Sequence, residues 1–311
     1  MRRCLAFLLC ALLLTAPALA LTEEEMDAAA DKAGREAAAL CVEEGMTDLE
    51  VLTVLHDWLA LHCDYGATLR GETAYGALVE GTGNCVGYAE GYARLAALAG
   101  LDGARTYSEE LDHAWILATL DGARYFSDCT WDDGKNQKLG LIRHRYFLFD
   151  EANASLVGHS GWDSAESVPG GALEDAPWRE AVTRVIFDGA YAYYIDGEFQ
   201  LIRCDRSTWE TEVLYRSEER WPPEEKGSTE LYTGLILVRD RLYFNTPGAI
   251  RYYDLRAGED RTVRTVYSDG LSVYGVAAVD GTLRFSLAES AAALDYDVFD
   301  TGISLSGAWG Y

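Results

Sequence analysis

The chain has 311 residues and a formal net charge of −25, with 49% hydrophobic and 12% aromatic residues. This length suffices for two domains, and the hydrophobic content excludes global disorder. The acidic excess is spread along the whole chain, which excludes a nucleic-acid binder that neutralises phosphates in bulk. Cationic substrates remain compatible with this charge, although solubility by like charge is the simpler explanation.

The first twenty residues have the composition of a targeting signal. Arg2-Arg3 precedes an apolar run from Leu5 to Leu14, and Ala18-Leu19-Ala20 is a small-x-small cleavage pattern. The apolar run is too short for a comfortable transmembrane helix. We therefore expect a protein that is secreted or associated with the cell envelope, cleaved after residue 20 and without a membrane span in its mature form. An uncleaved anchor is the alternative.

Cleavage there would remove two of the seven cysteines and leave an odd number. The remaining five are Cys41, Cys63, Cys85, Cys129 and Cys204. At least one thiol therefore stays unpaired within the chain even in an oxidising compartment. None of the five forms a Cys-x-x-Cys pair, and the histidines show no ligand spacing, so we expect no metal site. Cys41 and Cys63 could form a disulfide if the helices that carry them are antiparallel.

Three helices are predicted before residue 100. Thr22 and Glu25 form a capping box that opens an alanine-rich helix ending near residue 45. Asp48 is expected to cap a second helix, whose apolar residues repeat at helical spacing. His56 and His62 on this helix have no visible partner and are expected to be surface or packing residues. A glycine-rich loop then leads to a third helix, from Cys85 to about residue 99.

Three short strands are predicted next, at residues 104–108, 113–120 and 123–130. Asp121-Gly122 separates the last two and is a strong signal for a two-residue hairpin turn. In the register that this turn sets, Leu120 faces Ala123, and His113 and Asp128 become diagonal neighbours on one face. Such neighbours lie about 7 to 8 Å apart at the backbone, within reach of two side chains.

Cys85 gains reactivity from its predicted place at a helix start. Unpaired amides and the positive end of the helix dipole favour a thiolate there, and the same amides could stabilise an oxyanion. Gly83 and Gly87 leave room beside it for a substrate. His113 can act as the base, while Asp128 orients the imidazole. The residues alone therefore predict a Cys-His-Asp catalytic triad.

These motifs resemble those of a known superfamily. Residues 83–89 (Gly-Asn-Cys-Val-Gly-Tyr-Ala), 113–115 (His-Ala-Trp) and 128–133 (Asp-Cys-Thr-Trp-Asp-Asp) are similar to the three motifs of the bacterial transglutaminase-like superfamily. Residues 75–78, 146–148 and 159–160 resemble further segments of that group. The resemblance covers about residues 45 to 165 and implies a papain-like arrangement, with Cys85 as nucleophile, His113 as base and Asp128 as orienting acid. Ile116 departs from the frequent asparagine.

Beyond residue 179 the sequence changes to short alternating runs rich in tyrosine and valine. Similar aromatic triplets start at residues 193, 242 and 283, a spacing in the range of propeller-blade repeats, and the tail resembles β-propeller-like segments of some secreted bacterial proteins. We therefore expect an α+β chain: a signal peptide at 1–20, a papain-like transglutaminase-core domain at 21–168 with helices packed on an antiparallel sheet, a linker at 169–178, and an all-β repeat domain at 179–311.

Three other side chains are candidates for contact with the substrate or the oxyanion: Tyr75, Trp115 and Trp131. We expect the two tryptophans to pack around the site rather than to contact substrate. For Tyr75 a structural role and a binding role are equally supported. Cys129 follows the triad acid, and strand alternation would turn it to the opposite face, into the core.

The expected activity is acyl transfer from a peptide or glutamine carboxamide through a thioester, without a cofactor. Hydrolysis is favoured over crosslinking, because no motif for a second substrate is visible. The expected partner is a protein or peptide substrate, with the cell envelope as one setting. Two alternatives stay open: a catalytically silent binding scaffold at the envelope, and a metal-dependent hydrolase with cysteine and histidine ligands.

Overall fold

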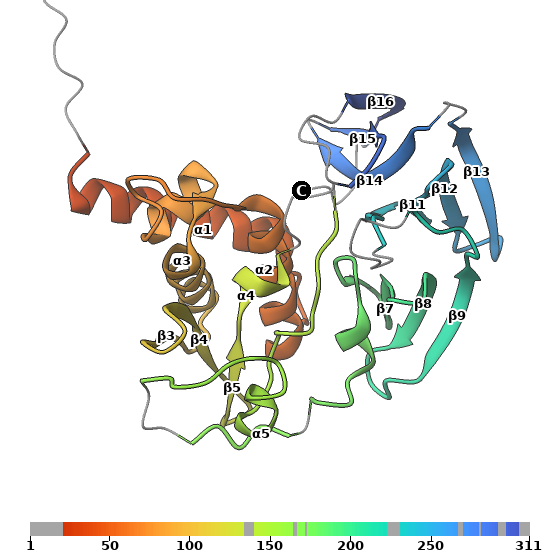
Figure 1. The fold of residues 1–311 in the computed structure, drawn as a ribbon. Helices are drawn as coiled ribbons and strands as arrows, with labels where there is room; N and C mark the ends of the chain where they lie inside the picture. The colour runs from red at the N-terminus through yellow and green to blue at the C-terminus, as the bar shows by residue number, and fades with distance from the viewer. Residues whose placement is uncertain are drawn as a thin grey trace, which may run out of the picture.

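The computed structural model describes residues 21–133, 140–163, 167–171, 173–222, 231–266, 270–279, 281–291 and 297–304. The expected signal peptide lies outside these ranges. Mixed helices and one antiparallel sheet form the first half of the chain, and three further antiparallel sheets form the second half (Figure 1). No helix within the described ranges is long and apolar enough to cross a membrane. The chain is therefore an α+β protein.

Three helices pack against one another in the first half: α1 (Glu23–Cys41), α2 (Asp48–His62) and α3 (Cys85–Leu98). The capping box of Thr22 and Glu25 at the start of α1 is confirmed. The predicted cap of α2 was wrong by one residue. Thr47 is the N-cap, because Glu50 lies three residues after it and completes a second capping box.

Cys41 and Cys63 are both buried thiols rather than a disulfide. Cys41 ends α1, close to the start of α2, whereas Cys63 follows the far end of the 15-residue α2. A helix of that length spans about 22 Å. An antiparallel arrangement therefore separates the two sulfurs, which is why the possible disulfide is not formed.

The loop between α2 and α3 packs closely on the start of α3. It contains a parallel pair of two-residue strands, β1 (Asp64–Tyr65) and β2 (Thr82–Gly83), and a short π-helix η1 (Gly76–Glu80). A Cβ atom on Gly87 would lie 2.1 Å from the carbonyl oxygen of Gly71. Glycine at position 87 is therefore required by backbone packing, rather than by the substrate access that the sequence suggested.

The central sheet of this half has the order β3 (Gly103–Ser108), β4 (His113–Leu120), β5 (Ala123–Ser127). Leu120 pairs with Ala123, so the register predicted from the turn is confirmed. The third strand is shorter than predicted. The side chain of Asp128 accepts hydrogen bonds from the next amides and starts a one-turn helix, α4 (Cys129–Asp132). A second short helix, α5 (Glu151–Ala154), follows.

The second half contains three meandering sheets, in each of which neighbouring strands are consecutive in the sequence. The first sheet comprises β6 (Ile186–Asp188), β7 (Tyr191–Ile195), β8 (Gln200–Asp205) and β9 (Thr211–Arg216). The second comprises β10 (Leu235–Val238), β11 (Arg241–Thr246), β12 (Ala249–Asp254) and β13 (Glu259–Thr265). The third comprises β14 (Ser272–Val279), β15 (Thr282–Ala288) and β16 (Asp297–Ser304).

The three aromatic triplets found in the sequence fall on β7, β11 and β15, the second strand of each sheet. About ten residues after each triplet the sequence has an aspartate preceded by cysteine or tyrosine. Asp205 ends β8, Asp254 ends β12 and Asp297 begins β16. Each sequence repeat therefore corresponds to one sheet. Figure 1 shows the sheets following one another in an arc beside the helices.

The two halves share one hydrophobic core. Residues 169–178, expected as a linker, contribute Leu173, Ala176 and Trp178 to the core that also holds the helices, and a 3₁₀ helix η2 (Pro177–Glu180) ends this segment. Side chains of the first sheet belong to the same core: Ala192, Tyr194, Ile202 and Cys204. At its edge Arg206 forms an ion pair with Glu50 of α2, with 2.6 Å between Nε and Oε1. The helices and the first sheet are thus packed as one unit.

Candidate active site

Three different elements bring the predicted triad together. Cys85 is the first residue of α3, and the side chain of Asn84 caps that helix by accepting from the amides of Val86 and Gly87. His113 is the first residue of β4. Asp128 follows β5 and caps α4. Since the hairpin register sets β4 against β5, it also sets the base against the acid.

Cys85 and His113 form an acid–base pair at this meeting point. Burial opposes ionisation of the Cys85 thiol, yet hydrogen bonding with His113 and with the amides of Ala114 and Val86 lowers its pKa below the ordinary value. Burial likewise opposes protonation of His113, but Asp128 and Cys85 together raise its pKa to about 9. Both shifts favour a thiolate beside an imidazolium over a neutral pair.

Asp128 is fully buried and uses both carboxylate oxygens. Oδ1 accepts from the amides of Thr130 and Trp131 at 3.0 and 3.2 Å. Oδ2 lies 2.6 Å from Nε2 of His113 and 2.9 Å from Nε2 of His159. Burial raises the pKa of this carboxyl, but hydrogen bonds from the two histidines outweigh it and lower the pKa. Because Nε2 of His113 faces the acid, Nδ1 is left for the thiol.

His159 is a site residue whose role the sequence did not reveal. It is fully buried and lies after α5, 31 residues from its partner Asp128. Only its presence in a segment resembling the superfamily singled it out, because no local pattern connects it with the acid. The structure makes the triad a four-residue chain, in which a second histidine shares the carboxylate oxygen that orients the first.

Aromatic rings enclose these histidines. Trp131 stacks on His113, with ring centroids 4.8 Å apart and an interplanar angle of 20°. Trp115 meets His159 edge to face at 4.7 Å and is 1% exposed, so it is a packing residue. Tyr75 packs against the core cluster that includes Cys85 and lies below the guanidinium of Arg70. Of the three extra candidates, Trp131 therefore stacks on a triad side chain, while the Trp115 ring is tilted to His113 with centroids 5.8 Å apart.

Some of the helix-start amides expected to bind an oxyanion already donate hydrogen bonds to another side chain. Asn84 Oδ1 holds the amides of Val86 and Gly87, at 3.0 and 3.2 Å. The amides of Val86 and Ala114 also face the Cys85 sulfur. The Ala114 amide, on β4 beside His113, is thus a donor near the Cys85 sulfur. The sequence did not suggest this donor.

A second buried cluster lies on the other side of α4. His56 Nδ1 is 3.0 Å from Asp57 Oδ1, and His56 Nε2 is 3.2 Å from Asp132 Oδ2. His144 Nε2 contacts the same Asp57 oxygen at 2.8 Å. His56 is completely buried between two carboxylates, so the expectation that it lacks a partner was wrong. His62 also has a partner, because its Nε2 lies 3.1 Å from the carbonyl oxygen of Leu78, and its ring stacks on Trp58 as the packing expectation had it.

Cys129 is buried, as expected, but for a different reason. It begins α4 instead of continuing a strand, and its thiol donates to the carbonyl oxygen of His56 at 3.5 Å. The helical turn, not strand alternation, directs it into the core.

Two groups of side chains have the composition of metal ligands: His56, Asp57 and His144, and the triad pair His113 and Asp128 with His159. In each group the ligand atoms lie within 4.8 Å of one another. In each, hydrogen bonds between the histidines and the shared carboxylate oxygen account for these contacts. The chemistry that the triad group offers without any ion is general acid–base and nucleophilic catalysis.

No protein-family model and no curated protein matches this sequence. Among solved structures, a TGase is 17% identical over 37% of this chain and 34% of its own, with a TM-score of 0.32. A candidate cysteine protease from Cytophaga hutchinsonii is 21% identical over 37% of this chain and 45% of its own, with a TM-score of 0.27. The computationally designed Ika4 protein is 13% identical over 60% of this chain and 86% of its own, with a TM-score of 0.28. The chain therefore spans less than half the length of the first two, and the likeness to them is weak.

Proposed function

We propose that this chain is a secreted, cysteine-dependent acyl-transfer enzyme that acts on carboxamides of peptides or glutamine side chains. The observation that carries the proposal is the chain of contacts from the thiol of Cys85 through His113 to Asp128. A thiol with a lowered pKa, beside a histidine held by a buried carboxylate, is the arrangement that covalent catalysis by cysteine requires.

In the proposed reaction the Cys85 thiolate attacks the carbonyl carbon of the amide. The imidazolium of His113 gives its Nδ1 proton to the departing amine, the C–N bond breaks, and a thioester remains on the sulfur. Water or an amine then attacks the thioester, and the now neutral His113 takes the proton of that nucleophile. The Cys85 thiolate leaves, and the site returns to its starting charge. Asp128 holds the ring through Nε2 in both steps.

We favour hydrolysis over crosslinking, with a protein or peptide substrate at or beyond the cell envelope. The chemistry needs no cofactor, because nucleophile, acid and base all come from side chains. The net charge of −25 fits cationic segments of such substrates better than nucleic acid. We further propose that the three repeat sheets are propeller-blade-like units that help to recruit the substrate.

The test is the rate at which iodoacetamide alkylates Cys85 as a function of pH, with the labelled residue identified by mass spectrometry. Other thiols provide internal controls, because burial raises the pKa of Cys63 to about 12 and that of Cys129 well above the ordinary value. We expect Cys85 to react as a thiol titrating below the free value of about 8.5. In a His113→Ala variant this titration should move upward.

An ordinary pKa in both proteins would refute the proposal and favour the silent scaffold. An activated thiol would justify screening labelled peptides for release of ammonia or of an amine. Incorporation of a lysine analogue instead of water would show crosslinking to be the reaction.

A further inference from the structure

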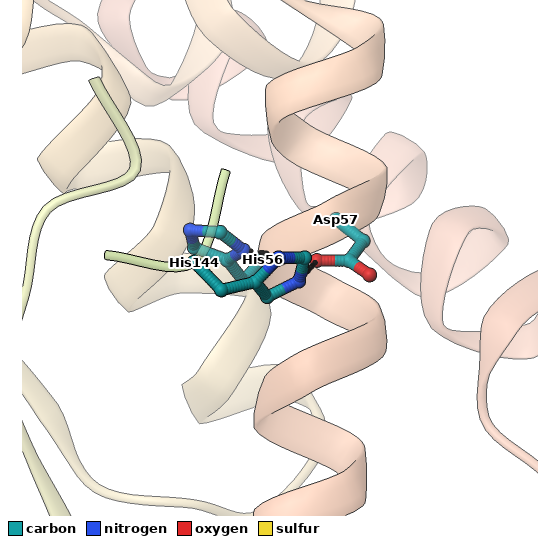
Figure 2. A group of neighbouring side chains, drawn as sticks. All are labelled: His56, Asp57 and His144. Carbon is teal, nitrogen blue, oxygen red and sulfur yellow. Dashed lines mark hydrogen bonds and ion pairs between the residues drawn. The ribbon is translucent and has the colours of Figure 1, made fainter. Parts of the chain in front are cut away.

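A buried chain of four titratable side chains lies outside the triad and takes no part in the proposed reaction. It runs from His144 through Asp57 and His56 to Asp132, and all four side chains are at most 5% exposed. Figure 2 shows His56 and Asp57 on one helix, with His144 entering from a separate segment and both rings directed at the Asp57 carboxylate. Such a chain is costly to bury unless each group is paired.

Both carboxylates of this chain are anchored to backbone. Asp57 Oδ2 accepts from the amide of Val185, just before β6, at 2.7 Å. Asp132 accepts from the amide of Tyr146, at 3.0 and 3.1 Å from its two oxygens. His56 lies between the two: Nδ1 is hydrogen-bonded with Asp57, and Nε2 makes an ion-pair contact with Asp132. Burial opposes protonation of this ring, but Asp132 and Asp57 together raise the pKa of His56 to about 9.

The end at Asp132 leads directly to the triad. Asp132 is the last residue of α4, and Asp128 is the cap that precedes the first. The Asp132 amide donates to the Asp128 carbonyl at 3.2 Å. The same turn carries Trp131, which stacks on His113. The orientation of this single turn therefore sets both the carboxylate and the ring that hold the catalytic imidazole.

A four-residue helix does not hold its own orientation, because so short a helix is unstable without tertiary contacts. His56 touches α4 at both ends: its ring contacts Asp132, and its carbonyl oxygen accepts from the thiol of Cys129. The backbone of Asp128 has a further anchor, since its amide donates to the carbonyl of Tyr146 at 2.8 Å. His56 is thus the side chain of α2 through which the helical core holds this turn.

We propose that His56 is a positioning residue for the triad: its ion-pair contact from Nε2 to Asp132 holds α4 and thereby the orientation of Asp128 and Trp131 against His113. This inference rests on the proposed function. The proposed role differs from a general contribution of His56 to stability, because it assigns the effect on Cys85 reactivity to Nε2 alone and not to Nδ1.

Two substitutions separate the two nitrogens. The amide nitrogen of glutamine occupies about the position of Nε2, and that of asparagine about the position of Nδ1. His56→Gln therefore keeps the donor to Asp132 and loses the donor to Asp57, while His56→Asn does the reverse. Both remove one charge and take one partner from a buried carboxylate, so their melting temperatures should fall by similar amounts.

We expect the pH profile of Cys85 alkylation to distinguish them. In His56→Gln the alkylation rate at pH 7 should stay within about threefold of that of the unsubstituted protein. In His56→Asn the rate should fall about tenfold or more and the thiol pKa should rise, because misplaced catalytic groups cause losses of this size. Equal profiles in two folded variants would overturn the inference while leaving the proposed function intact. An ordinary thiol pKa in the unsubstituted protein would refute the function itself, and the inference with it.

A second variant guards against a failure to fold. Asp132→Asn retains His56 and an oxygen for the Tyr146 amide, but it removes the negative charge that pairs with the ring, so the same loss of Cys85 reactivity is expected. An unchanged profile there would also overturn the inference. Metal analysis of the purified protein completes the test, because one equivalent of divalent metal held by His56 would replace the contacts on which the inference depends.

Discussion

At the scale of single residues, Asp128 is the group on which the site depends. One oxygen starts α4 and the other serves two histidines, so the residue is at once a helix cap and the orienting acid. The hairpin turn was enough to predict the pairing with His113. It was not enough to predict His159, because contacts made by a loop far along the chain leave no periodic or turn signal in the sequence.

Removal of the second donor to Asp128 tests the part played by His159. His159→Phe keeps a ring among the surrounding aromatic side chains but cannot donate, and hydrogen bonds to charged groups contribute about 1.5 to 3 kcal/mol. We expect Cys85 alkylation at pH 7 to fall about tenfold and its pKa to rise. His159→Gln, which retains a donor near the Nε2 position, is the matched control and should lose much less. Equal rates in both variants would make His159 a packing residue only.

The pH dependence of the thiol has a second expected step. Because the pKa of Cys85 is lowered, its thiol stays ionised to a lower pH than an ordinary thiol does. Because the pKa of His113 is raised to about 9, its ring stays protonated until about that pH. Above that pH His113 loses its proton, and a thiolate without a cationic neighbour becomes more nucleophilic. Alkylation should therefore rise once below the ordinary thiol pKa, level off, and rise again near pH 9. In a His113→Gln variant one rise should replace the two; two rises there would assign the upper step to another group.

At the scale of elements, turns and caps were predictable, and the places where local signals compete were not. Asp121-Gly122 gave the correct hairpin register, whereas the strand predicted to run through Asp128 ends at Ser127. The aspartate side chain bonds to its own following amides, and this local competition ends the strand. The contact of His56 with Asp132 was missed because only tertiary packing brings α4 to this residue of α2.

Gly87 provides a test of how the loop from residue 66 to residue 84 is seated on α3. A Cβ atom there would lie 2.1 Å from the Gly71 carbonyl oxygen, so Gly87→Ala must displace backbone. Overpacking of this kind costs about 1 to 3 kcal/mol. We expect a loss of that size in urea unfolding. Gly197→Ala is the control, because its Cβ would meet no atom within 4 Å, and its effect should be below about 0.5 kcal/mol. Similar losses in both would show that the close approach does not exist.

At the scale of the whole molecule, α2 is shared by the helical half and the first sheet of the tail. Core side chains from η2, β7 and β8 pack with the helices, and the Asp57–Val185 and Glu50–Arg206 contacts cross the same boundary. The composition change near residue 179 correctly located the start of the β-rich part. It did not show that the two parts share a core, because composition reports what each segment contains and not what it packs against.

Truncation provides a test of this shared core. A chain ending at residue 168 would expose the face of α2 that Trp178, Val185 and Tyr194 cover. We expect that fragment to show weak near-ultraviolet circular dichroism and strong binding of the dye ANS. In the chain of residues 21–311, by contrast, the helical half should unfold in a cooperative transition. A fragment with sharp tertiary signals and low dye binding would instead show that the helical half is an independent domain.

The sharing of α2 also constrains how such a chain can diversify. Domains that keep separate cores can be exchanged by recombination with little harm, since their interfaces are small and polar. Here a new tail would have to bring its own partners for Glu50 and Asp57 and its own cover for the apolar face of α2. Substitutions on α2 and on the first sheet are therefore expected to accumulate in matched pairs, whereas the described core side chains of the second and third sheets belong to other clusters and are expected to be replaced more freely.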